Sequence, residues 1–92
     1  MKGFDWNKEK NIELKKSRAV SFEDVIFHIQ NGDLLDVLDH PNKTKYPNQK
    51  IFVLVINEYI YYVPFVENDS SYFLKTIIPS RKLFKTYKNE IR

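Results

Sequence analysis

Several cations and aromatic side chains have the types and positions needed to hold RNA. Lys50, Lys75, Arg81 and Lys82 fall at the ends of predicted strands and helices. The neighbouring pattern also contains a set of tyrosines: Tyr46, Tyr59, Tyr61, Tyr62 and Tyr72. Proteins hold single-stranded RNA by neutralising its phosphates and by stacking its bases on aromatic rings. The collection is suited to phosphate and RNA, although tyrosines in strands are also often half-buried packing residues.

Cleavage of an RNA backbone makes three chemical demands on such a collection. One group must draw the proton from a 2′-hydroxyl, a cation must stabilise the charge developing at phosphorus, and a donor must protonate the leaving oxygen. His, Glu, Lys or Tyr can move the protons, and Arg or Lys can hold the charge. This chemistry requires no metal, so no cofactor is expected.

Composition excludes several other kinds of site. The chain has no cysteine, which removes disulfides, thiolate metal ligands and a cysteine nucleophile together. His28 and His40 are far apart in the sequence, and a packed or half-exposed role is expected for His28. Gly3 and Gly32 do not form a nucleotide-binding loop. The absence of disulfides in a small domain, of a visible signal peptide and of long apolar stretches leads us to expect a cytoplasmic protein without a membrane span.

The charge of the chain is unevenly distributed, although the net charge is only +3. Residues 21–40 carry five acidic residues and no Lys or Arg, whereas residues 75–92 carry six basic residues against Glu90 alone. Exposed charges more than about 8 Å apart are largely screened at physiological salt, so the local excess matters more than the total. A basic patch attracts polyanions, nucleic acid first; the alternative is a solvated charged face.

These residues must be positioned by one domain, expected over residues 1–92. Phe4-Asp5-Trp6 predicts a short strand or an anchored arm. Asn7 caps a predicted helix over residues 8–17, whose thin apolar face consists of Ile12 and Leu14. A second helix begins at Ser21, with Asp24 at the capping-box position, and ends at Asn31-Gly32.

Alternating and apolar segments then predict strands at 34–39, 50–56, 59–66 and 72–78. The segment 50–56 is apolar on both faces, which favours a central strand. Pro64 lacks a backbone donor and therefore indicates a bulge or an edge position. The prediction is an α+β fold: two N-terminal helices packed on a four-stranded antiparallel sheet, followed by a short C-terminal helix.

The C-terminal helix is predicted over residues 81–92, with Ser80 as its cap. Helical spacing places Arg81, Lys85, Lys88 and Arg92 on one side. It places Leu83, Phe84, Tyr87 and Ile91 on another. The helix should therefore dock by an apolar stripe and present a basic ridge.

Several short motifs, in order along nearly the whole chain, resemble the BrnT family. Phe4-Asp5-Trp6-Asn7 with Lys10 is similar to the F-x-W-D-x-x-K start of that family. The segment 20–24 resembles its V-S-F-E-E/D element, and Asp39-His40 resembles its D-x-D-H region. The segment 78–82 is similar to its I-S-A-R-K element.

The resemblance implies a RelE-like fold and the function of a bacterial toxin from a type II toxin–antitoxin pair. Such a toxin would be a metal-independent endoribonuclease that inhibits translation, and a cognate antitoxin would neutralise it in a hetero-oligomer. Two positions depart from the family. Gln49 stands where the family has glutamate and cannot be a general base, and Lys50 stands for arginine, which loses bidentate phosphate contact.

The residues and the resemblance together predict a site. Arg81 and Lys82 are the expected phosphate and transition-state contacts, Lys50 is a second cation, and His40 or Tyr62 carries protons. Further RNA contacts are expected from Lys75, Lys85, Lys88 and Tyr46. Two other functions stay open: a non-catalytic module that binds nucleic acid or protein with the same basic face, and an interaction protein that exposes a sheet edge near Pro64.

Overall fold

The computed structural model describes residues 3–87, which form two helices, a mixed sheet and a third helix in an α+β arrangement. The helices are α1 (Lys8–Arg18), α2 (Phe22–Gln30) and α3 (Arg81–Tyr87). The strands are β1 (Gly3–Trp6), β2 (Leu34–Asp39), β3 (Gln49–Ile56), β4 (Tyr59–Glu67), β5 (Ser71–Leu74) and β6 (Ile78–Pro79). Lys88 and Arg92, predicted on the basic ridge, lie outside the described residues.

The predicted start signals of α1 and α2 are confirmed. The Asn7 side chain accepts from the Lys10 backbone N–H at 3.0 Å. Ser21 and Asp24 form a capping box, in which each side chain accepts from the backbone of the other. Gly32 follows α2 with φ of 84°, a left-handed conformation that glycine adopts without steric cost. The chain is therefore turned sharply into β2.

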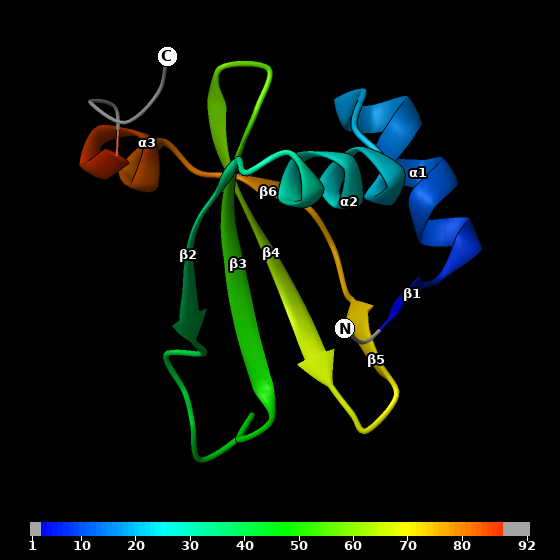
Figure 1. The fold of residues 1–92 in the computed structure, drawn as a ribbon, viewed down its shortest axis with the longest axis vertical. Helices are drawn as coiled ribbons and strands as arrows, with labels where there is room; N and C mark the ends of the chain where they lie inside the picture. Colours follow the sequence, from blue (N-terminus) through cyan, green and yellow to red (C-terminus); the bar gives the residue numbers. More distant parts are fainter. Residues whose placement is uncertain (1–2, 88–92) are drawn as a thin grey trace.

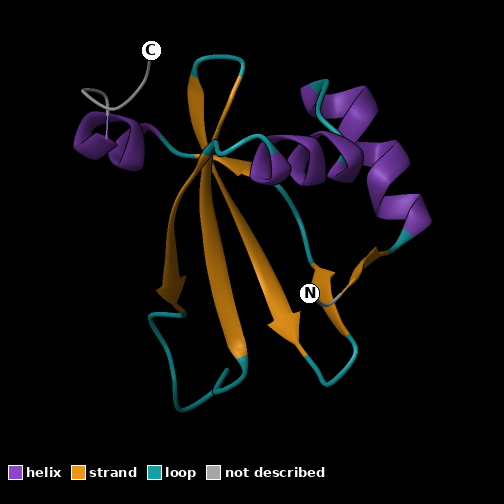
Figure 2. Cartoon of the chain, in the orientation of Figure 1, coloured by secondary structure: helices purple, strands orange, loops and turns teal. Residues whose placement is uncertain are grey.

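The sheet is mixed, which corrects the predicted four-stranded antiparallel sheet. Within residues 3–87 its order is β1-β5-β4-β3-β2, and β6 pairs with β4 (strands labelled in Figure 1 and drawn in orange in Figure 2). The four predicted strands are antiparallel neighbours, but β1 adds to β5 in parallel. β1 is held at β5 because Phe4 and Trp6 pack against the main core. In a free arm these two side chains would remain exposed to water.

A second correction concerns the segment 72–78, which is not one strand. β5 ends at Leu74 and β6 begins at Ile78. The Lys75 N–H donates to the Pro64 carbonyl at 2.8 Å, but Pro64 has no N–H with which to return the bond. The ladder stops there, and the Arg18 guanidinium donates to the Ile77 carbonyl in the gap. Pro64 is buried at this break rather than exposed at a sheet edge.

The two faces of the sheet are covered by different helices (Figure 1). α1 and α2 lie on one side, where Leu14, Phe22 and Val25 join alternate residues of β3 and β4 in the main core. α3 lies on the other side and contacts β4. Val53 in β3 and Ile60 in β4 alternate with the residues of the main core, and both are completely buried. In the described part of the chain, no helix is long and apolar enough to cross a membrane.

Candidate functional site

A cavity of about 650 Å³ lies between the sheet and α3, on the face opposite α1 and α2. We call it the α3 pocket. Its apolar lining comes from β2, β3, β4, β6, α3 and the loop after β2: Leu38, Pro41, Ile51, Pro64, Ile78 and Leu83. Ligand pockets commonly combine this size, of about 300–1,000 Å³, with a mainly apolar lining and a few polar groups. The α3 pocket therefore has the general character of a ligand site.

Polar side chains from separate segments also line this pocket: His40, Tyr62, Ser80 and Lys82. His40 directly follows β2, Tyr62 lies in the middle of β4, and Lys82 is the second residue of α3. The antiparallel register places Tyr62 beside Ile78, which brings the start of α3 to the same face. The structure thus brings His40, Tyr62 and Lys82 together in one pocket. The predicted catalytic set also contained Lys50 and Arg81.

His40 is held in a defined orientation by the loop that follows it. Its Nδ1 accepts from the Asn42 backbone N–H at 3.0 Å. The neutral ring therefore carries its hydrogen on Nε2, so Nε2 is a donor. The Tyr46 ring lies 4.5 Å from the His40 ring, centroid to centroid, and the Lys45 ammonium lies 5.4 Å from the Tyr46 centroid. Tyr46, a predicted RNA contact, is thus placed beside the pocket.

The start of α3 supplies the cations. The Ser80 Oγ accepts from the Leu83 backbone N–H at 3.2 Å, which confirms Ser80 as the helix cap. Arg81, Lys82 and Lys85 are exposed, while Leu83 is half-buried. The exposed cations and the half-buried Leu83 agree with the predicted division into a basic side and an apolar side, whereas the side chains of Phe84 and Tyr87, and Ile91, lie outside the described part of the structure. Of these three cations, Lys82 is the one that lines the pocket.

Lys50 does not join the pocket, in contrast to its predicted place as a second cation. Residues 50 and 51 point to opposite faces of β3, and Ile51 is the one that lines the pocket. The Lys50 ammonium lies 4.0 Å from the Glu67 carboxylate, in a different hollow. Strand alternation therefore separates Lys50 from Lys82.

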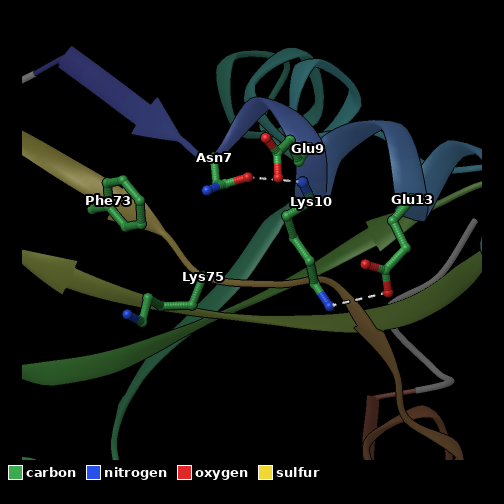
Figure 3. A pocket seen from close by; sticks show the side chains of 6 residues that line it. All are labelled: Asn7, Glu9, Lys10, Glu13, Phe73 and Lys75. Atoms are coloured by element: carbon green, nitrogen blue, oxygen red, sulfur yellow. Dashed lines mark hydrogen bonds and ion pairs between the residues drawn. The ribbon is translucent and has the colours of Figure 1, made fainter.

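Lys75 is also remote, in a shallow hollow beside α1 (Figure 3). Its ammonium lies 5.6 Å from the centroid of the Phe73 ring. Lys10 in the same hollow forms an ion pair with Glu13 at 3.6 Å. Glu9 and Glu13 balance the two lysines there, so this hollow lacks the positive excess that would attract a phosphate.

Several of the aromatic candidates have packing roles. The Tyr72 ring contacts Phe4, Phe52 and Phe65 with centroids 5.5 to 5.9 Å away. Tyr61 packs against the main core, and its ring lies 5.9 Å from that of Tyr59. Trp6, a residue of the family motif, packs on Phe22 at 6.0 Å. Tyr46 and Tyr62 are the tyrosines that remain as candidates beside the pocket.

The carboxylate nearest in sequence to His40 is already engaged. Asp39 accepts from the Lys43 ammonium at 3.0 Å, and this hydrogen bond and charge lower the pKa of the Asp39 carboxyl. Asp39 alternates with Leu38 along β2, so it points away from the pocket. Among the described residues no carboxylate lines the α3 pocket, and no group of His, Asp or Glu is arranged to hold a metal.

The apolar lining of the pocket was not predicted from the sequence. A signal was present, since the segment 50–56 is apolar on both faces and therefore needs cover on both. The described part of α3, Arg81–Tyr87, leaves part of the second face uncovered, and that part is the pocket. His28, by contrast, is as expected: it is half-buried, and its Nδ1 lies 2.8 Å from the Asp33 carboxylate.

Comparisons of the chain with models of protein families, with curated proteins and with solved structures find no match.

Proposed function

We propose that this chain is the toxin of a type II toxin–antitoxin pair and acts in the cytoplasm as a metal-independent endoribonuclease that inhibits translation. The observation that carries the proposal is the convergence of His40, Tyr62 and Lys82, from three segments, on one pocket. Arg81 and Lys85 extend the positive charge along α3. The BrnT-like order of motifs supports the same function.

The proposed reaction is attack of a 2′-hydroxyl on the adjacent phosphate, with departure of the 5′-oxygen and formation of a cyclic phosphate. Lys82 and Arg81 stabilise the charge that develops on the phosphate oxygens. The Tyr62 hydroxyl donates a proton to the departing oxygen, and the His40 Nε2–H donates a hydrogen bond to the phosphate. Because no described carboxylate lines the pocket, the 2′-hydroxyl proton passes to solvent.

A cognate antitoxin would neutralise the toxin by placing an acidic or amphipathic segment over the basic side of α3. That position covers Arg81 and Lys85 and blocks entry to the pocket. Lys50 and Lys75 have no part in this proposal, because both lie away from the pocket.

The decisive experiment compares two lysines on opposite faces of the sheet. Induction of the wild type in a bacterial host should arrest growth and fragment RNA. Lys82→Ala should abolish both effects, and Arg81→Ala should weaken them by tenfold or more, about the effect of one charged contact to a transition state. Lys50→Ala is the matched control and should retain full toxicity. A harmless wild type that leaves RNA intact in cells and in vitro would refute the proposal.

A non-catalytic RNA-binding module is the second candidate, favoured by Gln49 in place of the family glutamate and by the absence of a carboxylate among the described residues that line the pocket. Tyr62→Phe separates the two, since it keeps the ring and removes the proton donor. For a nuclease, cleavage should fall about a hundredfold while RNA affinity is unchanged. For a binding module, purified wild type should hold RNA with a steep salt dependence and never cut it.

A further inference from the structure

The lining of the α3 pocket is more apolar than the backbone of RNA requires. Phosphate and ribose are polar, and the cations that would hold them stand on exposed positions of α3. Leu38, Ile51 and Pro64 offer such a backbone no hydrogen bond or charge. Apolar side chains that line an open cavity gain free energy only when an apolar group displaces water from them.

The polar groups beside that lining narrow the kind of ligand. A ring hydroxyl at Tyr62, an imidazole donor at His40 and an ammonium at Lys82 line one cavity. A ligand that matches the lining and these groups has a flat, largely apolar body joined to a polar anion. A nucleotide has this composition, and unpaired bases of RNA are commonly splayed out and stacked on aromatic side chains.

We infer that the α3 pocket takes one unpaired base of single-stranded RNA, with the adjoining phosphate at Lys82 and Arg81. The inference rests on the proposed function and deepens it, since it makes the substrate an unpaired segment. The size of the cavity, about 650 Å³, suits a ligand of this class. A base held in a duplex can enter only at the cost of unpairing and unstacking it, a few kcal/mol, which disfavours a duplex relative to a single strand.

The contacts of Tyr46 with His40 and Lys45 support this assignment from the loop that follows β2. Tyr46 is exposed enough, at 37%, to present its ring to a neighbouring base. The loop is held by its own hydrogen bonds, with the Tyr46 N–H donating to the Asn42 carbonyl at 2.9 Å and the Gln49 N–H donating to the Tyr46 carbonyl at 3.2 Å. The ring next to His40 is therefore already in position before RNA binds.

The test measures the contribution of bases to affinity without any cleavage. A short 2′-O-methyl oligoribonucleotide, which cannot be cut, is compared with a chain of the same length that lacks bases. Wild type should bind the complete oligonucleotide about tenfold to a hundredfold more tightly, as expected for a stacked base. A duplex of the same sequence should bind no better than the chain without bases.

Two neighbouring positions on β2 provide a matched pair of variants. Leu38 lines the pocket, whereas Val37 points to the other face and is 45% exposed. Leu38→Trp should fill the pocket, so the affinity for the complete oligonucleotide should become close to the affinity for the chain without bases. Val37→Trp should leave the ratio of these two affinities unchanged. Tyr62→Leu, which removes the ring without adding bulk, should lower the ratio as well. Thermal melts of all three confirm that the proteins are folded.

The outcomes separate this inference from the proposed function. If Leu38→Trp and Tyr62→Leu keep the wild-type ratio, or if wild type does not distinguish the two chains, the base pocket is refuted even when wild type still cuts natural RNA. If wild type prefers bases and the pocket variants do not, the base pocket stands even when no RNA is cut. If the oligonucleotide does not bind at all, the inference is also refuted. The remaining explanation is then that the apolar lining binds a side chain of a partner protein.

Discussion

The two faces of the sheet are built from the same strands but reach different degrees of closure. On the α1–α2 face, Phe52, Leu54 and Ile56 are no more than 6% exposed. On the α3 face, Val53 is completely buried, while Ile51 and Tyr62 are half-buried along a cavity. α1 and α2 close the first face, whereas the described part of α3 leaves a cavity on the second. The comparison indicates that stability comes mainly from one side of β3 and β4, whereas the other side carries the cavity to which we assign the proposed function.

The sharpest test of this contrast removes side chains from opposite faces of one strand. Leu54→Ala should lower the free energy of unfolding by about 3 kcal/mol, because it leaves a cavity in a closed core. Ile51→Ala should cost about 1 kcal/mol, because its side chain already borders open space. Chemical denaturation measures both. Equal losses at the two positions would show that the α3 face is as tightly packed as the other.

A buried amide gives the next largest effect, again on the closed face. Asn11 is 5% exposed and joins α1 to α2. Its Oδ1 accepts from the Phe22 backbone N–H at 2.8 Å, and its Nδ2 donates to the Glu23 carboxylate at 2.7 Å. Asn11→Ala leaves the buried Phe22 N–H without an acceptor and removes the charge-assisted bond to Glu23. We therefore expect the free energy of unfolding to fall by about 2 kcal/mol.

The matched control for this variant is Asn42→Ala, on the pocket side. Asn42 lies in the exposed loop, and its side chain accepts from the Lys45 backbone N–H at 3.0 Å. Water can replace that bond, so the expected loss is about 0.5 kcal/mol or less. A loss at Asn11 as small as that at Asn42 would argue against a stabilising junction between α1 and α2.

Local signals made much of the closed face predictable. Asn7, the Ser21–Asp24 capping box and Gly32 each fix a helix end through short-range geometry, and all were read from neighbouring residues. Side-chain burial on α1 was harder to predict. Ile12 was expected on its apolar face but is 53% exposed, and Asn11 takes the buried position beside Leu14. A buried polar residue depends on partners from α2, which periodicity along α1 does not reveal.

The open face depended on long-range pairing, and the sequence predicted its residues better than their arrangement. His40, Tyr62 and Lys82 were predicted from their chemistry and from the family resemblance together, and their meeting requires the pairing of β2, β3, β4 and β6. Lys50 lies away from these three residues, because the alternation of β3 turns it to the other face. The break between β5 and β6 was hinted at by Pro64, but its extent depends on Arg18, 59 residues away from Ile77. Such contacts are not visible in a local pattern.

The smallest expected effect is the pH dependence that Glu23 gives to the closed face. The Asn11 side-chain hydrogen bond is the main cause that lowers the pKa of the Glu23 carboxyl from 4.5, and its backbone hydrogen bond and Lys15 act in the same direction. A carboxyl whose pKa is lower in the folded state contributes stability that is complete above its ordinary pKa and is lost as the pH falls through the lowered value. Wild type should therefore lose more thermal stability than Glu23→Gln when the pH is taken from neutral to below that range. The difference should be small, since Glu23 is largely exposed and solvent screens its charge.

Asn11→Ala should reduce the pH dependence in the same way, because it removes the main cause of the lowered Glu23 pKa. If wild type and both variants melt in parallel across the acidic range, Glu23 is not a significant part of the α1–α2 junction, and the stability of that face comes from apolar packing alone.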